Sequence, residues 1–296
     1  MQKQAVLLMS YGTPNNTEEI WEYYTHIRHG KEPSQELYAE LVGRYEEIGG
    51  ASPLAKITEA QRLAVEAKLN TDSVIEYRVF TGLRHIRPFI EDAVQEIVAQ
   101  GFTTIHGMVL AQHNSSFIKQ YHERVEKALA HTEISYLPHV HFWQQPGFQT
   151  FWAKQIQAAI DPNKKQKFLF TAHSLPERLL LNGDPYVDEI TSAAQAITAR
   201  VGELDFGHAW QSAGRTADKW IGPRVEDVTV ELIQAGYQEI IYLPFGFVAD
   251  NLETLYDNDI ECKELVEKLG GNYRRLTMPN VDADFIAGLV DEIKSV

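Results

Sequence analysis

The segment IEDAVQEIVAQGFTTIHGMVLA, residues 90–111, aligns without a gap on VEDVTVELIQAGYQEIIYLPFG, residues 225–246. The two segments share Glu, Asp, Glu, Gly and Ile at matching positions, and their apolar positions also match. In each, an amphipathic helical pattern leads through a glycine into an apolar run typical of a strand. We interpret the pair as one helix–turn–strand unit that occurs twice, with chance similarity between amphipathic helices as the alternative.

The same alternation of strand and helix patterns extends over the whole chain. Helical stretches, including ones predicted to begin at Pro88, Tyr186 and Arg224, separate the apolar runs. Such alternation predicts parallel sheets covered by helices on both faces. The predicted strands are residues 5–11, 74–82, 104–111 and 134–137 in the first half and 167–173, 206–210, 239–247 and 272–278 in the second.

We therefore predict an α/β protein of two similar Rossmann-like domains with a cleft between them. The predicted domains are residues 1–143 and 144–296, with the boundary at the WQQPGF stretch, residues 143–148. The last helix is expected in the second domain, with packing back onto the first as an alternative.

Composition excludes several classes of protein. The formal net charge of −14 does not suit binding to a phosphate backbone, so no nucleic-acid partner is expected. No stretch approaches the roughly 18 apolar residues of a membrane span. The single cysteine, Cys262, can neither form an intrachain disulfide nor supply the four thiolates of an iron–sulfur cluster. A cytoplasmic protein without a tightly bound cofactor is therefore expected.

Three carboxylates are spaced four residues apart near the C-terminus, in NLETLYDNDIECK, residues 251–263. On an α-helix, Glu253, Asp257 and Glu261 would form one line about 12 Å long. Like charges at this spacing destabilise a helix by a few tenths of a kcal/mol per pair. The row is explained either by a cation or basic partner or by a solvated acidic face.

Unusual polar residues follow four of the predicted strands, at residues 11–14, 112–115, 173–176 and 250–251. Ligands of parallel sheets bind outside the carboxyl ends of strands. His173 ends an apolar run there, where it is either a base or a histidine satisfied by neighbouring backbone. A neutral imidazole accepts a proton or binds a transition metal, and carboxylates guide a divalent ion. The combination suggests a cation meeting a weakly acidic substrate.

The segment from Trp21 to Ser52 mixes aromatic rings, cations and hydroxyls. This mixture suits a large planar ligand that carries carboxylates, although aromatic residues at helical spacing are commonly core. The chain has no GxGxxG, Walker, GxSxG, CxxC or HExxH motif, so nucleotide binding, serine hydrolysis and a closed zinc site have no motif behind them. The residues concerned are Trp21, Tyr23, Tyr24, Arg28, His29, Lys31, Arg44, Tyr45 and Ser52.

Eight motifs in order carry a family resemblance that spans nearly the whole chain. The chain resembles the ferrochelatases, and among them the short enzymes of Gram-positive bacteria that insert iron into coproporphyrin III. The resemblance implies two chelatase-type domains with a porphyrin cleft between them. The motifs are LLMSYGTP, YYTHIRHGKEP, RYEEIGGASPLAKIT, GLRHIRPFIEDAV, TAHSLPE, GDPY, WQSAGRTADKWIGP and GFVADNLETLYDNDIEC.

The resemblance also implies roles for individual residues. His173 is implied to be the catalytic histidine, and Glu253 its acidic partner across the pocket; both would contact the metal. Asp257 and Glu261 would continue the metal path. Tyr11 would lie on the other face of the macrocycle and touch the iron of the product. Positions implied to hold propionates or line the cleft are Arg28, Arg44, Tyr45, Ser52 and Tyr121.

Two positions depart from the family pattern. Asn251 stands where relatives commonly have histidine, so it cannot titrate as a base. Gln112 replaces a more usual proline.

The implied substrates are Fe²⁺ and coproporphyrin III, and a monomer with transient haem-pathway partners is expected. Protoporphyrin IX as the porphyrin, a cobalt or nickel chelatase acting on sirohydrochlorin, and a non-catalytic haem- or metal-binding protein are the alternatives.

Overall fold

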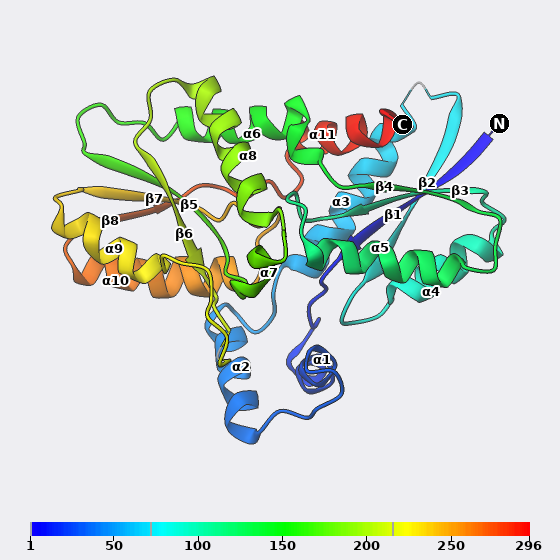
Figure 1. Cartoon of the computed structure of the whole chain (residues 1–296), viewed down its shortest axis with the longest axis horizontal. Helices are drawn as coiled ribbons and strands as arrows, with labels where there is room; N and C mark the ends of the chain where they lie inside the picture. The colour runs from blue at the N-terminus through cyan, green and yellow to red at the C-terminus, as the bar shows by residue number, and fades with distance from the viewer. Residues whose placement is uncertain (1, 72, 215) are drawn as a thin grey trace.

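A computed structural model describes residues 2–71, 73–214 and 216–296. It contains two parallel four-stranded sheets, ordered β2-β1-β3-β4 and β6-β5-β7-β8, which lie side by side with helices around them (Figure 1). The predicted α/β class with two similar parallel-sheet units is confirmed. Because β1 corresponds to β5 and β3 to β7, the two sheets repeat one strand order.

The repeated segment occupies the same place in both sheets. Helix α4 (Ile90–Ala99) leads into β3 (Thr104–Val109), and α9 (Val225–Gln234) leads into β7 (Glu239–Leu243). Each of these strands is third in its sheet, next to the strand that begins that half. The interpretation of one unit used twice is therefore confirmed by topology.

In the first half, helices cover both faces of the sheet (Figure 1). Strand β1 is apolar from Ala5 to Met9 and fully buried, as expected for a parallel strand covered on both faces. In chain order the elements are β1 (Gln2–Ser10), η1 (Thr17–Glu19), α1 (Ile20–Ile27), α2 (Gln35–Glu47), α3 (Leu54–Leu69), β2 (Ile75–Leu83), α4, β3, α5 (Ser116–Leu129), β4 (Ser135–His139) and η2 (Phe142–Gln144).

The second half repeats the strand order of the first, but its connecting helices differ in number, and it contains a π-helix at its acidic segment. There η3, a π-helix, runs directly into α10. The elements are α6 (Pro146–Gln157), β5 (Gln166–His173), α7 (Arg178–Leu181), α8 (Tyr186–Val201), β6 (Phe206–Gln211), α9, β7, η3 (Thr254–Cys262), α10 (Lys263–Lys268), β8 (Asn272–Arg275) and α11 (Ala283–Lys294).

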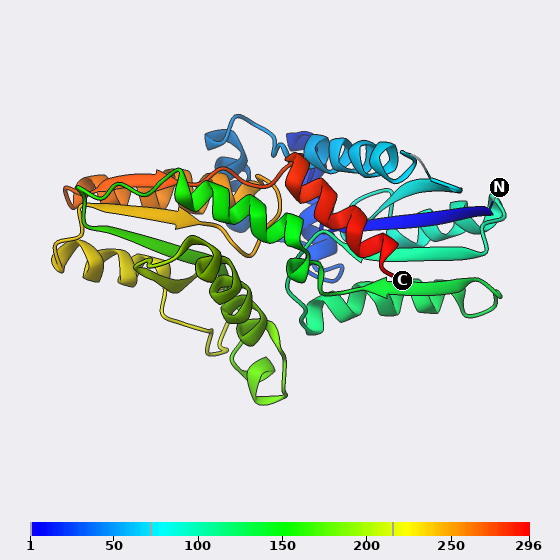
Figure 2. The ribbon, with the colours of Figure 1, turned by 90° about the horizontal axis from the view of Figure 1, so that it is seen from above.

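One apolar cluster includes residues of both sheets. It contains Val6 of β1 and Phe168 of β5, together with Trp152 of α6 and Phe285 of α11. Helix α11 packs on α6 and also on α3 of the first half, and Figure 2 shows α6 and α11 lying along each other above the sheets. The two sheets are therefore placed relative to each other by buried contacts. The predicted boundary at residues 143 and 144 falls within η2, between β4 and α6.

Three details of the predicted elements were wrong. The strand predicted at residues 272–278 ends at Arg275. The strand predicted at residues 239–247 ends at Leu243, because Pro244 has no N–H to donate to the sheet and residues 244–247 form a turn. Helix α6 was not predicted. It begins with Pro146 at its first turn, where the missing N–H costs nothing, and buries Phe151, Trp152 and Ile156.

Candidate functional site

The two sheets place all four predicted strand ends beside a change in strand order. In each sheet the chain goes from the first strand of that half to a neighbour on one side and then crosses to the other side of the first strand. The positions between β1 and β3 and between β5 and β7 are therefore topological switch points. Ligands of open α/β sheets bind at the carboxyl ends of such strands. Tyr11 follows β1, His113 follows β3, His173 ends β5, and Asp250 follows β7 after a short turn.

Tyr11 is accessible and yet surrounded by polar neighbours. Its side chain is 43% exposed, and its ring lies 4.4 Å from that of His85 and 6.4 Å from that of Tyr23. Burial by nearby atoms raises the pKa of Tyr11, and the negative charge of Glu253 raises it further.

Two further tyrosines of the first half have raised pKa values, and the charge of Glu253 contributes to that of Tyr45. Burial raises the pKa of Tyr45 to about 12, a hydrogen bond with Thr13 opposes this, and Glu253 adds to it. Burial likewise raises the pKa of Tyr121 to about 12, against the nearby cation of Arg84. The predicted residues Tyr11, Tyr45 and Glu253 thus share one electrostatic environment, although they come from opposite halves of the chain.

His173 is held in one tautomer by the backbone. Its Nδ1 lies 2.6 Å from the carbonyl oxygen of Ser174, which can only accept, so Nδ1 carries the proton and Nε2 keeps the lone pair. The hydroxyl of Tyr186 donates to the carbonyl of His173 at 3.2 Å and fixes the backbone there. The half-buried imidazole can therefore accept a proton or bind a metal through Nε2.

His173 and the acidic segment are both connected to the carboxyl end of β6. His173 pairs in register with Gln211, the last residue of β6. The side-chain amide of Asn258 donates to Gln211 Oε1 at 3.2 Å, and the next residue, Ser212, donates its hydroxyl to Asp257. These contacts connect the strand that carries His173 to the helix that carries the carboxylates.

The helix type expected for the carboxylates was wrong. Thr254–Cys262 is a π-helix with Glu253 at its N-cap, so the 12 Å line of an α-helix does not apply. Single π-helical turns are uncommon and occur often at functional sites. Along the row, Glu253 is half-buried, Asp257 is buried and Glu261 is exposed. The middle carboxylate of the row is therefore the most buried.

Asp257 is a buried carboxyl with a raised pKa. Burial raises its pKa to about 7, the hydrogen bond from Ser212 opposes this, and the charges of Glu253 and Glu261 add to it. Arg44 NH1 lies 3.6 Å from Asp257 Oδ1, and the Arg44 guanidinium lies over the Tyr256 ring at 4.7 Å. A divalent cation would relieve the repulsion among these carboxylates. The residues that the structure describes contain no group of three His, Cys, Asp or Glu side chains suited to holding a metal ion.

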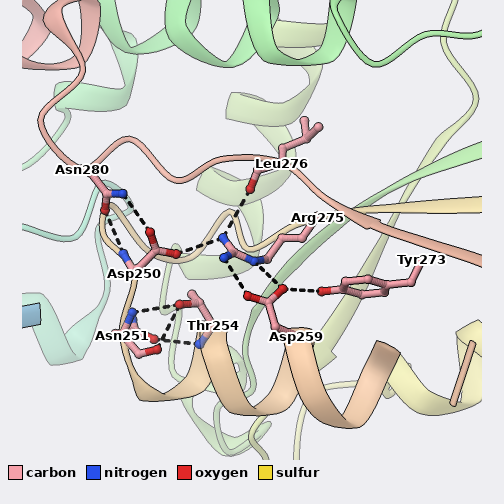
Figure 3. A network of polar contacts seen from close by, with 8 residues as sticks. All are labelled: Asp250, Asn251, Thr254, Asp259, Tyr273, Arg275, Leu276 and Asn280. Carbon is pink, nitrogen blue, oxygen red and sulfur yellow. Dashed lines mark hydrogen bonds and ion pairs between the residues drawn. The ribbon is translucent and has the colours of Figure 1, made fainter. Parts of the chain in front are cut away.

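Asn251 caps the acidic segment. Its side-chain oxygen accepts a hydrogen bond from the Thr254 N–H at 2.8 Å, and its own N–H donates to Thr254 Oγ1 at 2.8 Å (Figure 3). This reciprocal pair is a capping box of the kind that starts helices. Asn251 is buried, and its carbonyl oxygen also accepts from the Thr254 hydroxyl. The amide at this position thus has a local structural role.

Two predicted substrate residues contact residues that are close to them in the sequence. Arg28 follows α1, where its Nε donates to the Lys31 carbonyl at 3.3 Å and its guanidinium lies 5.8 Å from the Tyr24 ring centre. Ser52 is buried, and its Oγ accepts from the Leu54 N–H at the start of α3. Two surface hollows of about 450 and 410 Å³ border α3, and neither is lined by a predicted site residue.

The structure adds side chains that the sequence prediction did not include. Ser212 contacts Asp257 directly, and its φ of 58° is unusual for a residue other than glycine. Arg84 lies over the Tyr121 ring at 5.0 Å, and His85 packs on Tyr11. These residues stand in the quoted motifs WQSAGRTADKWIGP and GLRHIRPFIEDAV, which were the available signal.

His113 predicts a measurable sensitivity to acid. Burial lowers its pKa to about 3, below the value near 6.5 of an unfolded chain. The unfolded state therefore binds the extra proton first, and stability is lost as pH falls from about 6.5 toward 3. Lowering the pH from 7.5 to 5.5 should decrease the free energy of unfolding of the unmodified protein. We expect this decrease to be smaller in His113→Gln, by on the order of 1 kcal/mol.

Denaturant unfolding at the two pH values measures this difference, and His131→Gln, at an exposed position, is the control. Equal pH dependence in all three proteins would contradict the expectation.

No helix of the described residues is both long and apolar enough to cross a lipid bilayer.

The fold resembles solved chelatase structures. It matches SirB from Bacillus subtilis with Fe³⁺ at a TM-score of 0.65 and 13% identity, covering 100% of this chain and 95% of that one. It matches CbiX, described as the terminal enzyme for biosynthesis of siroheme in denitrifying bacteria, at a TM-score of 0.58 and 15% identity, covering 98% of each chain. At these identities the likeness concerns the fold alone.

The sequence is similar to curated proteins over nearly its whole length. A protein named coproporphyrin III ferrochelatase from Oceanobacillus iheyensis is 44% identical, with 99% of this chain and 96% of that protein covered. One of the same name from Geobacillus kaustophilus is 43% identical, with 97% and 94% covered. The profile of the ferrochelatase family matches residues 3–296. Together with the paired parallel sheets and the acidic row at their carboxyl ends, this match establishes that the chain belongs to the ferrochelatase family.

Proposed function

We propose that this protein inserts Fe²⁺ into coproporphyrin III and releases two protons, as a step of haem synthesis. The observation that carries the proposal is the position of Glu253. Its charge acts on Tyr11 and Tyr45 of the first half and on Asp257 of the acidic row. One carboxylate is thus close enough to influence both a residue proposed to contact the porphyrin and one proposed to deliver iron. The names of the relatives at 43–44% identity support the same reaction.

The chemistry requires three changes, and residues are available for each. The porphyrin must bend so that nitrogen lone pairs point out of its plane, two pyrrole N–H protons must leave, and Fe²⁺ must lose water. Contacts to the propionates and the ring surface lower the barrier only if they favour the bent ring over the flat one. In the proposal Arg28, Arg44, Tyr45, Ser52 and Tyr121 make these contacts.

His173 and Glu253 are proposed as the reacting pair. The lone pair on His173 Nε2 accepts one pyrrole proton. This lone pair is available because the proton of the imidazole is on Nδ1, where it is donated to the Ser174 carbonyl. Glu253 accepts the second proton or passes Fe²⁺ to the ring. Asp257 and Glu261 supply oxygen ligands that exchange with the water of the ion on its way. Tyr11 lies on the opposite face of the macrocycle, where its hydroxyl can meet the iron of the product.

Coproporphyrin III is preferred over protoporphyrin IX because it carries four propionates instead of two. Each propionate gains from a guanidinium or hydroxyl partner. Arg84, which lies over Tyr121 and donates to the Phe117 carbonyl and Gln120, adds a further cation near this region. The protein is proposed to act in the cytoplasm as a monomer without a tightly bound cofactor, in transient contact with other haem-pathway enzymes. Residues 1–143 and 144–296 are proposed as its domains.

The test is anaerobic incubation of the purified protein with Fe²⁺ and either porphyrin, followed by absorption spectroscopy. We expect many turnovers with coproporphyrin III and fewer with protoporphyrin IX. A preference for protoporphyrin IX would reverse the choice of substrate. One equivalent of metalloporphyrin or less, with no further turnover, would instead identify a binding protein.

A further inference from the structure

We propose that Arg275 is a positioning residue for iron delivery, which holds residues 250–262 so that the acidic row faces away from β8. The proposal rests on the proposed function. It concerns a network around Asp250 and Asp259, which is separate from the contacts of Asp257 with Ser212 and Arg44. Figure 3 shows this network, with Arg275 between two carboxylates.

Arg275 joins both ends of the acidic segment to β8. Its Nε and NH2 contact Asp259 Oδ1 and Oδ2, each at 2.8 Å, and its NH1 lies 3.0 Å from Asp250 Oδ1. Asp250 precedes the capping residue Asn251, whereas Asp259 lies within the π-helix. A bidentate pair fixes orientation as well as distance. The Arg275 side chain is only 14% exposed, so solvent screens these contacts weakly.

The network continues from Arg275 to a helix of the first half. The Tyr273 hydroxyl donates to Asp259 at 2.9 Å. Asn280 donates its side-chain amide to Asp250 at 2.8 Å and accepts from the Asp250 N–H at 2.9 Å. The carbonyl of Asn280 accepts from the buried Gln61 of α3 at 2.8 Å. Helix α3 begins beside Ser52, so the network links the proposed porphyrin-binding segment to the proposed iron path.

The two faces of the acidic segment have different partners. Asp257 is contacted by Ser212 and Arg44, whereas Asp259, two residues later, is contacted by Arg275 and Tyr273. A shift of the π-helix that broke the second set would move Asp257 with it. Because π-helical turns are rare and need support from their surroundings, tertiary contacts are required to keep this register. Arg275 supplies three of them.

A purely stabilising ion pair is the alternative, since removing one member of a buried pair destabilises a protein strongly. The two roles differ in what they change. Loss of stability alone would alter all kinetic constants together or none of them. Loss of position would change the iron requirement selectively.

The experiment compares Arg275→Met and Arg275→Lys with Arg274→Met. Arg274 is the exposed neighbour on β8, so its replacement removes the same charge from the same strand. We expect Arg275→Met to raise the Fe²⁺ concentration for half-maximal rate by about 10–100-fold, the usual effect of losing a residue that orients metal ligands. The rate at saturating iron and the affinity for coproporphyrin should change less than about threefold, and Arg275→Lys should lie in between.

Anaerobic calorimetric titration of the porphyrin-free variants with Fe²⁺ separates this inference from the proposed function. If no protein inserted iron, weaker Fe²⁺ binding in Arg275→Met than in Arg274→Met would still support the inference. The double variant Asp257→Asn/Glu261→Gln must show the same loss of Fe²⁺ affinity. If Arg275→Met does not fold, Tyr273→Phe, which removes one bond to Asp259, replaces it with a smaller expected shift in the same direction.

Two results would overturn the inference. The first is Fe²⁺ dependence and affinity in Arg275→Met equal to those of Arg274→Met. The second is a parallel decline of the saturated rate, porphyrin affinity and melting temperature with no selective change toward iron.

Discussion

Replacing His173 with alanine is expected to slow iron insertion by about 10²–10⁴-fold while coproporphyrin still binds. The reason is the position of one lone pair. The Ser174 carbonyl holds the proton on Nδ1, so Nε2 is the acceptor that the variant loses. Porphyrin binding depends on other side chains, and none of the residues proposed to contact the propionates uses His173 as a hydrogen-bond partner among the contacts that the structure describes.

Single-turnover insertion with pre-bound porphyrin measures the chemical step, and quenching of porphyrin fluorescence measures binding. His131→Ala, which removes an exposed imidazole, is the matched control. Insertion at the unmodified rate by His173→Ala would remove this residue from the mechanism. Loss of porphyrin binding together with activity would assign it to the substrate pocket instead.

Glu253→Gln is expected to reduce iron insertion to a similar degree, including at saturating iron. Gln keeps the shape of the side chain and removes its charge, which acts on Tyr11, Tyr45 and Asp257. If Glu253 takes part in the final transfer, no excess of Fe²⁺ restores the rate. If it belongs only to the delivery row, high iron concentrations do so.

The measurement is the initial rate over a wide range of Fe²⁺ concentrations. Glu264→Gln is the control, because it removes an exposed carboxylate from the adjoining helix α10. Full recovery of the rate at high iron would contradict a role for Glu253 at the reacting centre and would leave it with Asp257 and Glu261 in delivery.

Several parts of the fold could be predicted because they depend on local patterns. Buried parallel strands require continuous apolar runs, and those at residues 5–11 and 167–173 are such runs. The matched segments at residues 90–111 and 225–246 predicted a duplicated unit, and both occupy the third strand of their sheets. Helix α6 was missed even though it has a buried apolar face, because the stretch at residues 143–148, where it begins, was interpreted as the domain boundary.

The candidate site could be predicted only in part. His173, Glu253 and Asp257 were chosen from strand ends, spacing and motifs, and the structure places them on neighbouring elements. The spacing of the carboxylates did not distinguish an α-helix from a π-helix, since both bring residues four apart to one side. Ser212 could not be found from spacing, because its contact with Asp257 joins residues 45 positions apart.

By itself, the sequence determined the number of strands and their order along the chain, the internal repeat and the chemical groups available at the strand ends. Hydrophobic periodicity and turn residues act within a few positions of the chain, which is why they can be read without a structure. Only the tertiary structure decided that Thr254–Cys262 is a π-helix, that Ser212 contacts Asp257, and that Arg275 contacts both Asp250 and Asp259. These features depend on contacts such as that between Gln61 and Asn280, 219 residues apart, which exist only after both sheets have packed on their shared core.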